Sequence, residues 1–156
     1  MSELLQAIYR GDRARADELL AGEPELDVFE ASAVGRTDRL RELLDEDPSL
    51  ANAWADDGFQ PLGLASFFGH VEAARLLLER GADVNSASRN DFKVAPLHSA
   101  VAEKDPGSRY ELAALLLEHG ADPNARQQDD FTPLMAADQQ GDERLRALLV
   151  EHGATD

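Results

Sequence analysis

The segment LLLERGADVN at residues 76–85 decides the fold, because the chain repeats it. The pattern returns 39 positions later as LLLEHGADPN at residues 115–124, and 33 positions after that in the shorter form LLVEHGA at residues 148–154. A Pro-Leu pair precedes each copy, at Pro61, Pro96 and Pro133. Internal similarity at a spacing of this size indicates a protein built from stacked repeats.

Each copy is predicted to contain two short helices joined by a turn and followed by a loop. In the clearest unit the helices cover residues 61–68 and 71–80, with Gly69 and His70 as the turn. Proline suits the first position of a helix, because its missing N–H costs no hydrogen bond there. Helices this short are not stable alone, so each unit needs its neighbours, which predicts a solenoid.

Two weaker units precede these copies. Gly11 and Gly35 hold the turn position of Gly69, and helices are expected over residues 2–10, 12–21, 27–34 and 37–46. Five helix pairs then fill the chain, so we expect a single domain with repeats at about 1–26, 27–56, 57–90, 91–129 and 130–156. The first and last pairs are expected to be caps, because they carry polar residues where inner repeats are apolar.

From about residue 57 to residue 154 these features resemble the ankyrin-repeat family. Residues 61–85 look like one full ankyrin repeat, and residues 95–100 (APLHSA) and 131–134 (FTPL) are similar to its TPLHxA signature. The resemblance implies an all-α ankyrin-repeat solenoid of about five helix-turn-helix repeats with hairpin-like finger loops. It also implies protein binding on the concave face, the surface formed by the first helix of each pair and the finger loops.

The chain departs from the signature at two kinds of position. The threonine that caps the first helix is kept only at Thr132, and Gln60 and Ala95 replace it elsewhere. Loss of such a cap costs about 0.5–2 kcal/mol. The signature histidine is kept only at His98, so we expect the usual hydrogen bonds between repeats to be altered.

Composition narrows the class of partner. The net charge of −16 disfavours nucleic acid and anionic membranes as partners and favours a basic protein.

The chain has no cysteine, which excludes disulfides and thiol catalysis, and no apolar run long enough to span a bilayer. We therefore expect a cytoplasmic monomer. The two lysines beside thirteen arginines, with abundant alanine, indicate a GC-rich coding bias and hence a bacterial source. We expect a small stand-alone bacterial protein of this family.

No motif indicates catalysis or a cofactor. The histidines are His70, His98, His119 and His152. All four fall where ankyrin repeats carry a polar residue for structure, and a zinc site would need further ligands close by. Phosphate-binding loops and nucleophile motifs are absent from the sequence. We therefore predict a non-enzymatic protein without a metal or cofactor.

Aromatic and basic residues on the concave face are the candidate contacts. Trp54, Phe92, Lys93, Arg89 and Arg126 fall on finger segments, and Phe67 and Phe68 end the first helix of the middle repeat. Aromatic residues and arginine dominate binding hot spots. Phe59 and Phe131 are interpreted instead as braces of the fingers, and a structural role stays open for Trp54 and for one of Phe67 and Phe68.

The second copy of the repeated pattern, from Pro96 to Gly120, carries four extra residues, within residues 103–110. Asp105 to Ser108 is predicted to be a turn. This insertion is either a specificity loop or a tolerated surface insertion.

Two functions follow from these patterns. The first is a protein-interaction module that binds its partner on the concave face. The alternative is an acidic inhibitor or immunity-type protein that blocks a basic enzyme such as a nuclease. The alternative predicts a contiguous acidic patch on the concave face and an association rate that falls steeply with salt.

Overall fold

The computed structural model describes residues 1–156 and contains helices but no strands. The ten α-helices are α1 (Glu3–Tyr9), α2 (Arg13–Ala21), α3 (Val28–Val34), α4 (Thr37–Glu46), α5 (Pro61–Phe67), α6 (Val71–Glu79), α7 (Pro96–Val101), α8 (Pro106–Glu118), α9 (Pro133–Gln140) and α10 (Glu143–Glu151). Two 3-10 helices, η1 (Pro48–Asn52) and η2 (Gln128–Asp130), lie in the loops. The predicted all-α fold of helix-turn-helix units is confirmed. None of the helices has the length and apolarity needed to cross a membrane.

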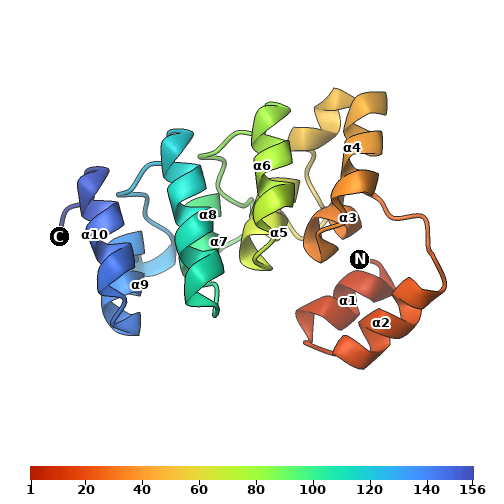
Figure 1. Cartoon of the computed structure of the whole chain (residues 1–156), viewed down its shortest axis with the longest axis horizontal. Coiled ribbons are helices and arrows are strands. Elements are labelled where there is room, and N and C mark those ends of the chain that lie inside the picture. The colour runs from red at the N-terminus through yellow and green to blue at the C-terminus, as the bar shows by residue number, and fades with distance from the viewer.

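Consecutive helices pack in pairs, and the pairs stack in two rows. The inner row contains α3, α5, α7 and α9, and the outer row contains α4, α6, α8 and α10 (Figure 1). The pair α1–α2 departs from this order, because it is turned relative to the other four pairs (Figure 1). Helix α1 packs on α3, whereas α2 makes no comparable packing with α4.

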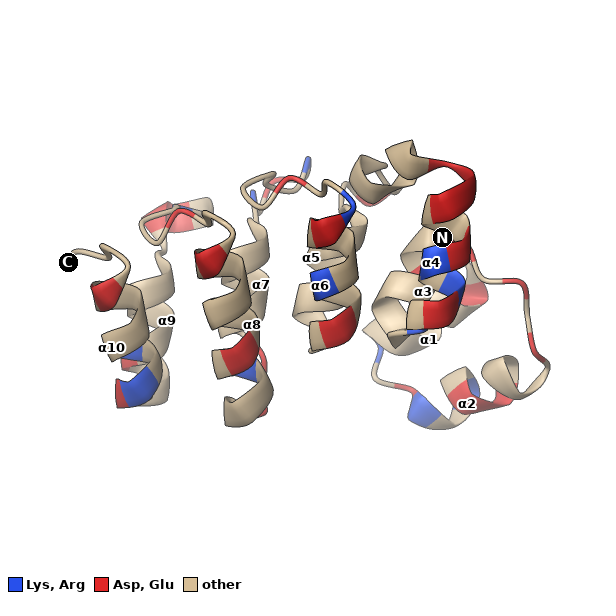
Figure 2. Cartoon of the chain, turned by 45° about the horizontal axis from the view of Figure 1, so that its top comes forward, with Lys and Arg blue, Asp and Glu red and all other residues tan.

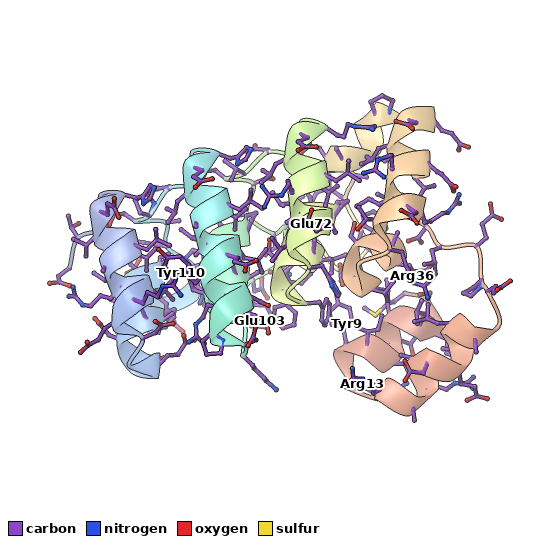
Figure 3. All side chains as sticks on the ribbon, in the orientation of Figure 1. Tyr9, Arg13, Arg36, Glu72, Glu103 and Tyr110 are labelled. Atoms are coloured by element: carbon purple, nitrogen blue, oxygen red, sulfur yellow. The ribbon has the colours of Figure 1, made fainter.

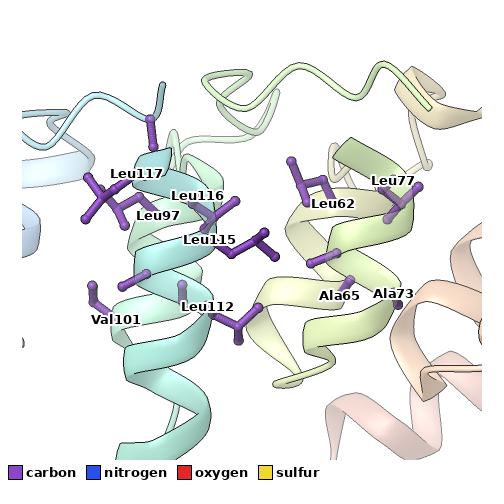
Figure 4. Packing of buried hydrophobic residues seen from close by; sticks show 14 of the residues in the cluster. Leu62, Ala65, Ala73, Leu77, Leu97, Val101, Leu112, Leu115, Leu116 and Leu117 are labelled. Atoms are coloured by element: carbon purple, nitrogen blue, oxygen red, sulfur yellow. The ribbon is translucent and has the colours of Figure 1, made fainter. Parts of the chain in front are cut away.

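Leucine and alanine fill the space between the rows. One continuous cluster of 31 buried residues runs through all five pairs, and Leu62, Leu97 and Leu116 are among its fully buried side chains (Figure 4). Alanine at positions such as Ala65 and Ala73 lets neighbouring helices approach closely, and leucine fills the remaining gaps (Figure 4). The core is therefore elongated: it extends along the stack between the inner and outer rows and has no single centre.

Glycine is required at the turn between α3 and α4. Gly35 has a φ of +74°, and a Cβ atom there would lie 2.5 Å from Nδ1 of His70. The His70 ring occupies this space because its Nε2 bonds the Ala33 carbonyl at 2.9 Å. A left-handed turn in one repeat thus receives a side chain from the next, which fixes their spacing.

Asparagines in the fingers link each repeat to the next. Each side-chain amide donates to the carbonyl of the glycine after the next outer helix, and its oxygen accepts a backbone N–H two residues beyond that glycine. The three asparagines are Asn52, which spans Gly81 and Asp83, Asn85, which spans Gly120 and Asp122, and Asn124, which spans Gly153 and Thr155. These bonds have distances of 2.8–3.0 Å. Because the glycine of one repeat bonds the asparagine of the repeat before it, the LLL-x-x-GAD-x-N segment recurs as a unit.

The prediction of a turn at Asp105 to Ser108 is wrong, because these residues begin a helix. Asp105 caps α8 by accepting the Ser108 N–H at 3.0 Å, and proline occupies the first turn. Helix α8 has 13 residues, whereas α2, α6 and α10 have nine each. The four extra residues therefore lengthen an outer helix by about one turn, and they form no separate loop.

Candidate functional site

The finger loops form one connected edge of the concave face. They cover residues 47–60, 80–95 and 119–132. The Arg89 N–H donates to the Gly58 carbonyl at 2.8 Å, and the Gln128 N–H donates to the Phe92 carbonyl at 2.9 Å. Because each finger is bonded to the next through the backbone, side chains on the fingers are presented from a fixed frame.

The tip of each finger has a left-handed residue at the same repeat position. Gly58, Lys93 and Asp130 have φ angles of +88°, +52° and +57°. Each lies two residues before the N-cap of the next inner helix. Lys93, which is exposed, is therefore held in a backbone conformation that residues other than glycine rarely adopt.

Phe67 and Phe68 lie together at the end of α5. Their rings meet edge to face with centroids 4.9 Å apart. The Phe68 ring is half-buried and lies 5.7 Å from the ring of Tyr9 on α1. Phe67 remains 49% exposed. Of the two, Phe68 thus packs within the molecule, whereas Phe67 is free to contact a partner.

Trp54 and Arg89 also meet, on adjacent fingers. The guanidinium carbon of Arg89 lies 3.8 Å from the centre of the Trp54 ring, which is cation–π geometry. The half-buried indole lines a cavity of about 210 Å³ together with Leu5, Phe29 and Asp57. One side of Trp54 therefore braces the next finger, while its edge borders a small cavity.

The other predicted contacts stand apart from these two groups. Phe92 is 59% exposed on the second of the three fingers. Arg126 is exposed on the third finger and makes only a long ion pair of 3.7 Å with Asp130. Phe59 and Phe131 are half-buried at equivalent positions beside the inner helices, in agreement with their interpretation as braces.

Sequence reasoning did not select Tyr9 or Asp57 as site residues. The Tyr9 hydroxyl donates to Asp57 Oδ2 at 2.8 Å, which joins α1 to the first finger. Figure 3 shows Tyr9 at the junction between the α1–α2 pair and the rest of the stack. A signal was present, because Tyr9 precedes the turn glycine by two residues, as Phe67 does. What the sequence could not show is the turned first pair.

The fingers carry carboxylates without cationic partners. Asp56, Asp91 and Asp129 are exposed, one on each finger, and none takes part in an ion pair. Acidic segments are visible along the finger loops above the inner helices (Figure 2). The negative charge on this edge is therefore available to a basic group of a partner.

The four histidines bond the scaffold, as their structural interpretation predicts. His70 and His98 bond carbonyls of a neighbouring repeat or finger, and His119 and His152 bond carbonyls of their own helices. Burial lowers the pKa of His70 and of His98 despite these hydrogen bonds. The structure contains no group of three or more histidine or acidic side chains placed to hold a metal ion.

The altered signature residues make substitute contacts. Gln60 forms no cap of α5, but its side-chain amide donates to the Asn52 carbonyl at 2.9 Å. Ala95 offers no side-chain acceptor, and His98 Nδ1 instead accepts the Ala95 N–H at 3.3 Å. Thr132 keeps the usual bond to the Met135 N–H. Gln60 and Ala95 thus each take part in a side-chain hydrogen bond at the start of an inner helix, although the capping threonine is absent.

Comparison with known proteins identifies the repeats. A family model described as ankyrin repeats (3 copies) matches residues 4–127. The chain is 38% identical over 85 residues to DNA-binding protein RFXANK of Homo sapiens, a match that covers 53% of this chain and 33% of that protein. It is 44% identical over 61 residues to serine/threonine-protein kinase VIK of Arabidopsis thaliana, covering 39% of this chain and 14% of that one.

A third similar protein is Ankyrin repeat and SAM domain-containing protein 6 of Mus musculus. It is 39% identical over 59 residues, which cover 38% of this chain and 7% of that protein. The chain thus spans at most about a third of these relatives' own length.

Proposed function

The chain belongs to the ankyrin-repeat family, and from this premise we propose that it is a non-enzymatic binding module that holds a partner protein on its concave face. Ankyrin repeats are typically protein–protein interaction modules, and only ankyrin repeats match this chain in the family comparison. The fold names no partner, so the proposal depends on the chemistry of the face.

Exposed aromatic side chains on a rigid face are the observation that carries the proposal. Phe67 and Phe92 leave about half or more of their surface in water, at 49% and 59% exposure. An aromatic side chain is costly to leave in water and supplies much of the binding energy when a partner buries it. Phe67 extends this surface beside Phe68 at the end of α5, and Phe92 extends it on a finger.

The backbone bonds between fingers support tight binding. A face whose loops are already ordered loses little conformational entropy when a partner binds. Gly58, Arg89, Phe92 and Gln128 make the bonds that fix these loops. The Trp54–Arg89 stack adds a side-chain contact between the same fingers.

A basic partner fits the face best. The molecule has a net charge of −16, and the exposed finger carboxylates Asp56, Asp91 and Asp129 have no ion-pair partner within the chain. Lys93, Arg89 and Arg126 lie among them, so the partner surface is expected to be mixed, with basic groups predominating.

A narrower second candidate is an acidic inhibitor or immunity-type protein that blocks a basic enzyme. The unpaired finger carboxylates favour it, because such a protein would use them to accelerate the encounter with its target. For this candidate the association rate should fall at least tenfold between low and physiological salt, whereas a general interaction module should lose much less.

Affinity capture from a lysate of the source organism, followed by reconstitution with the purified partner, tests the proposal. Phe67→Ala and Phe92→Ala should each raise the Kd for the partner at least tenfold, because each removes an exposed aromatic anchor of the concave face. Val150→Ala is the matched control, because Val150 is an exposed hydrophobic residue, 46% exposed, on outer helix α10.

Circular dichroism should show unchanged helix content in all three variants. If the Val150 variant lost affinity while both phenylalanine variants bound normally, the partner would lie on the outer face and the proposal would be wrong.

A further inference from the structure

The first helix lies over part of the concave face. Leu5 of α1 is buried in a cluster with Ala33 of α3 and Leu64 of α5, to which Phe59 and Phe68 add half-buried rings. Side chains from three successive repeats therefore meet under α1. This cluster is separate from the main core, to which α1 contributes Leu4 and Ala7, and it joins α1 to inner helices α3 and α5, which line the face that the proposed function uses.

The second helix is attached to the stack by few side chains. Ala16 is the only buried residue of α2, Leu19 and Leu20 are half-buried against the main core, and α2 does not join the outer row. An open groove of about 730 Å³ separates it from α4, with Leu20, Pro24 and Arg39 among the residues that line it. The pair α1–α2, residues 3–21, is thus held to the molecule mainly through α1. We call this pair the N-terminal hairpin.

The contact between α1 and the first finger is also loosely packed. A pocket of about 210 Å³ borders Leu5 and Trp54, and a shallow one of about 380 Å³ borders Tyr9 and Phe59. Both pockets open to solvent, so they interrupt the contact between α1 and the finger. The hydrogen bond from Tyr9 to Asp57 and the Tyr9–Phe68 ring contact join α1 to the finger and to α5 beside these pockets.

The connector after α2 has the features of a hinge. Residues 21–25 are exposed, and Glu23 has a φ of +49°, in the left-handed region. The chain is then anchored again at Leu26, which is buried and whose carbonyl accepts Arg39 Nε at 3.0 Å. A change of backbone angles between Ala21 and Leu26 would move the hairpin without disturbing α3 or α4.

We propose that the N-terminal hairpin is a displaceable cover of the concave face, which opens about the connector at residues 22–25 to expose Ala33, Leu64 and Phe68 to a partner. The effect of the hairpin on partner binding rests on the proposed function, whereas the opening of the hairpin is a property of this chain alone. The partner segment that replaces α1 would be apolar, because it takes over the surface that Leu5 buries. A partner that needs this surface must compete with α1, so its apparent affinity is reduced by the fraction of molecules that are closed.

Thiol labelling of single-cysteine variants tests the opening, because the natural chain has no cysteine. Ala33→Cys places a thiol on α3 under the hairpin, and Ala74→Cys places one on α6 in the main core. In the natural chain each of the two alanines is at most 2% exposed. Under native conditions the Ala33 variant should react with a soluble disulfide reagent at least tenfold faster than the Ala74 variant. Equal slow rates would show that the hairpin is a fixed part of the stack.

A second substitution keeps the test specific. Leu5→Ala, which removes the side chain that α1 buries, should speed labelling at Ala33→Cys at least tenfold and leave Ala74→Cys unchanged. Asp17→Asn on α2 is the control, because the Asp17 residue is exposed and its side chain makes no hydrogen bond or ion pair. A rise at both thiols would mean general destabilisation and would overturn local opening.

The reconstituted partner then reports on function. If the hairpin competes with the partner, Leu5→Ala should bind at least threefold more tightly than the natural chain. If it binds more weakly, the hairpin is part of the binding surface and the proposed cover is wrong, while binding on the concave face still stands. Loss of binding in Phe67→Ala concerns the proposed function alone, so the two proposals fail separately.

Discussion

At the scale of single residues, His98 shows how a buried side chain joins two repeats. Its ring is 4% exposed, Nε2 bonds the Ala125 carbonyl at 2.9 Å, and Nδ1 accepts the Ala95 N–H at 3.3 Å. One nitrogen must donate and the other must accept, so only the neutral ring with its proton on Nε2 satisfies both bonds. Protonation would break the bond to Ala95, the residue that replaces the capping threonine.

This geometry predicts a loss of stability in mild acid. Burial lowers the pKa of His98 in the folded state below its ordinary value of 6.5. The unfolded chain therefore binds more protons, and this contribution to stability is full above pH 6.5 and is lost as the pH falls toward the folded pKa. Because one proton is involved, the slope from His98 is at most about 1.4 kcal/mol per pH unit.

Urea unfolding at several values between pH 7.5 and pH 5.5 measures this slope. His98→Gln should have a smaller slope than the natural chain, at the cost of lower stability at pH 7.5. The same substitution at exposed His152 is the control. Equal slopes in the natural chain and the His98 variant would show that His98 does not carry the pH dependence.

At the scale of elements, the lengthened α8 acts as a clamp on α10. Arg109 in its added turn is 7% exposed, and it bonds Asp142 Oδ2 through Nε and Nη2 at 3.0 and 2.7 Å, while Nη1 bonds the Glu103 carbonyl at 2.9 Å. Burial disfavours the Asp142 carboxylate, but the Leu145 N–H and Arg109 outweigh this effect and lower its pKa. Asp142 also caps α10. The insertion therefore fastens the last repeat.

Removal of the arginine tests the clamp. Arg109→Ala leaves the Asp142 carboxylate, whose side chain is only 13% exposed, without its cation and should lower the free energy of unfolding by about 3 kcal/mol. Arg144→Ala is the control, because Arg144 is exposed, stacks on Tyr110 at 3.8 Å, and acts on Asp142 only through its charge, with no hydrogen bond or ion pair. It should cost less than about 1 kcal/mol. Similar losses in the two variants, measured by urea unfolding, would show that the buried pair contributes no more than a surface contact.

How far the sequence predicts these elements depends on how local the determinant is. The repeated segments predict the helix pairs and the turn glycines, because caps, turns and apolar faces are each determined by residues within a short stretch of sequence. At the added turn of α8 the local sequence predicts a separate turn, because Asp105-Pro106-Gly107-Ser108 has both turn and helix-start chemistry. Only the tertiary contact of Arg109 with Asp142 decides between them.

The candidate contacts were predicted less completely, for the same reason. Their positions on fingers and inner helices follow from the repeat pattern, but their exposure depends on neighbours. Phe67 and Phe68 are adjacent in sequence and differ in burial because α1 places Tyr9 against only one of them. The turned hairpin depends on weak, long-range packing, which no short motif encodes.

At the scale of the whole molecule, the excess of negative charge is arranged in register by the repeats. Glu79, Glu118 and Glu151 are the last residues of α6, α8 and α10, and all three are exposed and outside any ion pair. Acidic segments appear at the same end of these three helices (Figure 2). A carboxylate at a helix C-terminus is repelled by the partial negative charge of the helix dipole. Because the repeats stack in register, this unfavourable arrangement recurs along the outer row.

The final prediction follows from this arrangement and separates helix position from net charge. Glu151→Gln at the end of α10 should stabilise the fold by about 0.3–1 kcal/mol at low salt, because it removes a charge that opposes the dipole. Glu143→Gln in the first turn of the same helix changes the net charge equally but removes a favourable charge, so it should not stabilise. Thermal unfolding of both variants in low salt and in 0.3 M salt measures the difference in stability between them. At 0.3 M the Debye length is about 6 Å, so the difference should shrink as ions screen the interaction with the dipole. If both variants gained the same stability, overall repulsion would dominate over the dipole, and the position of acids along each repeat would matter less than their number.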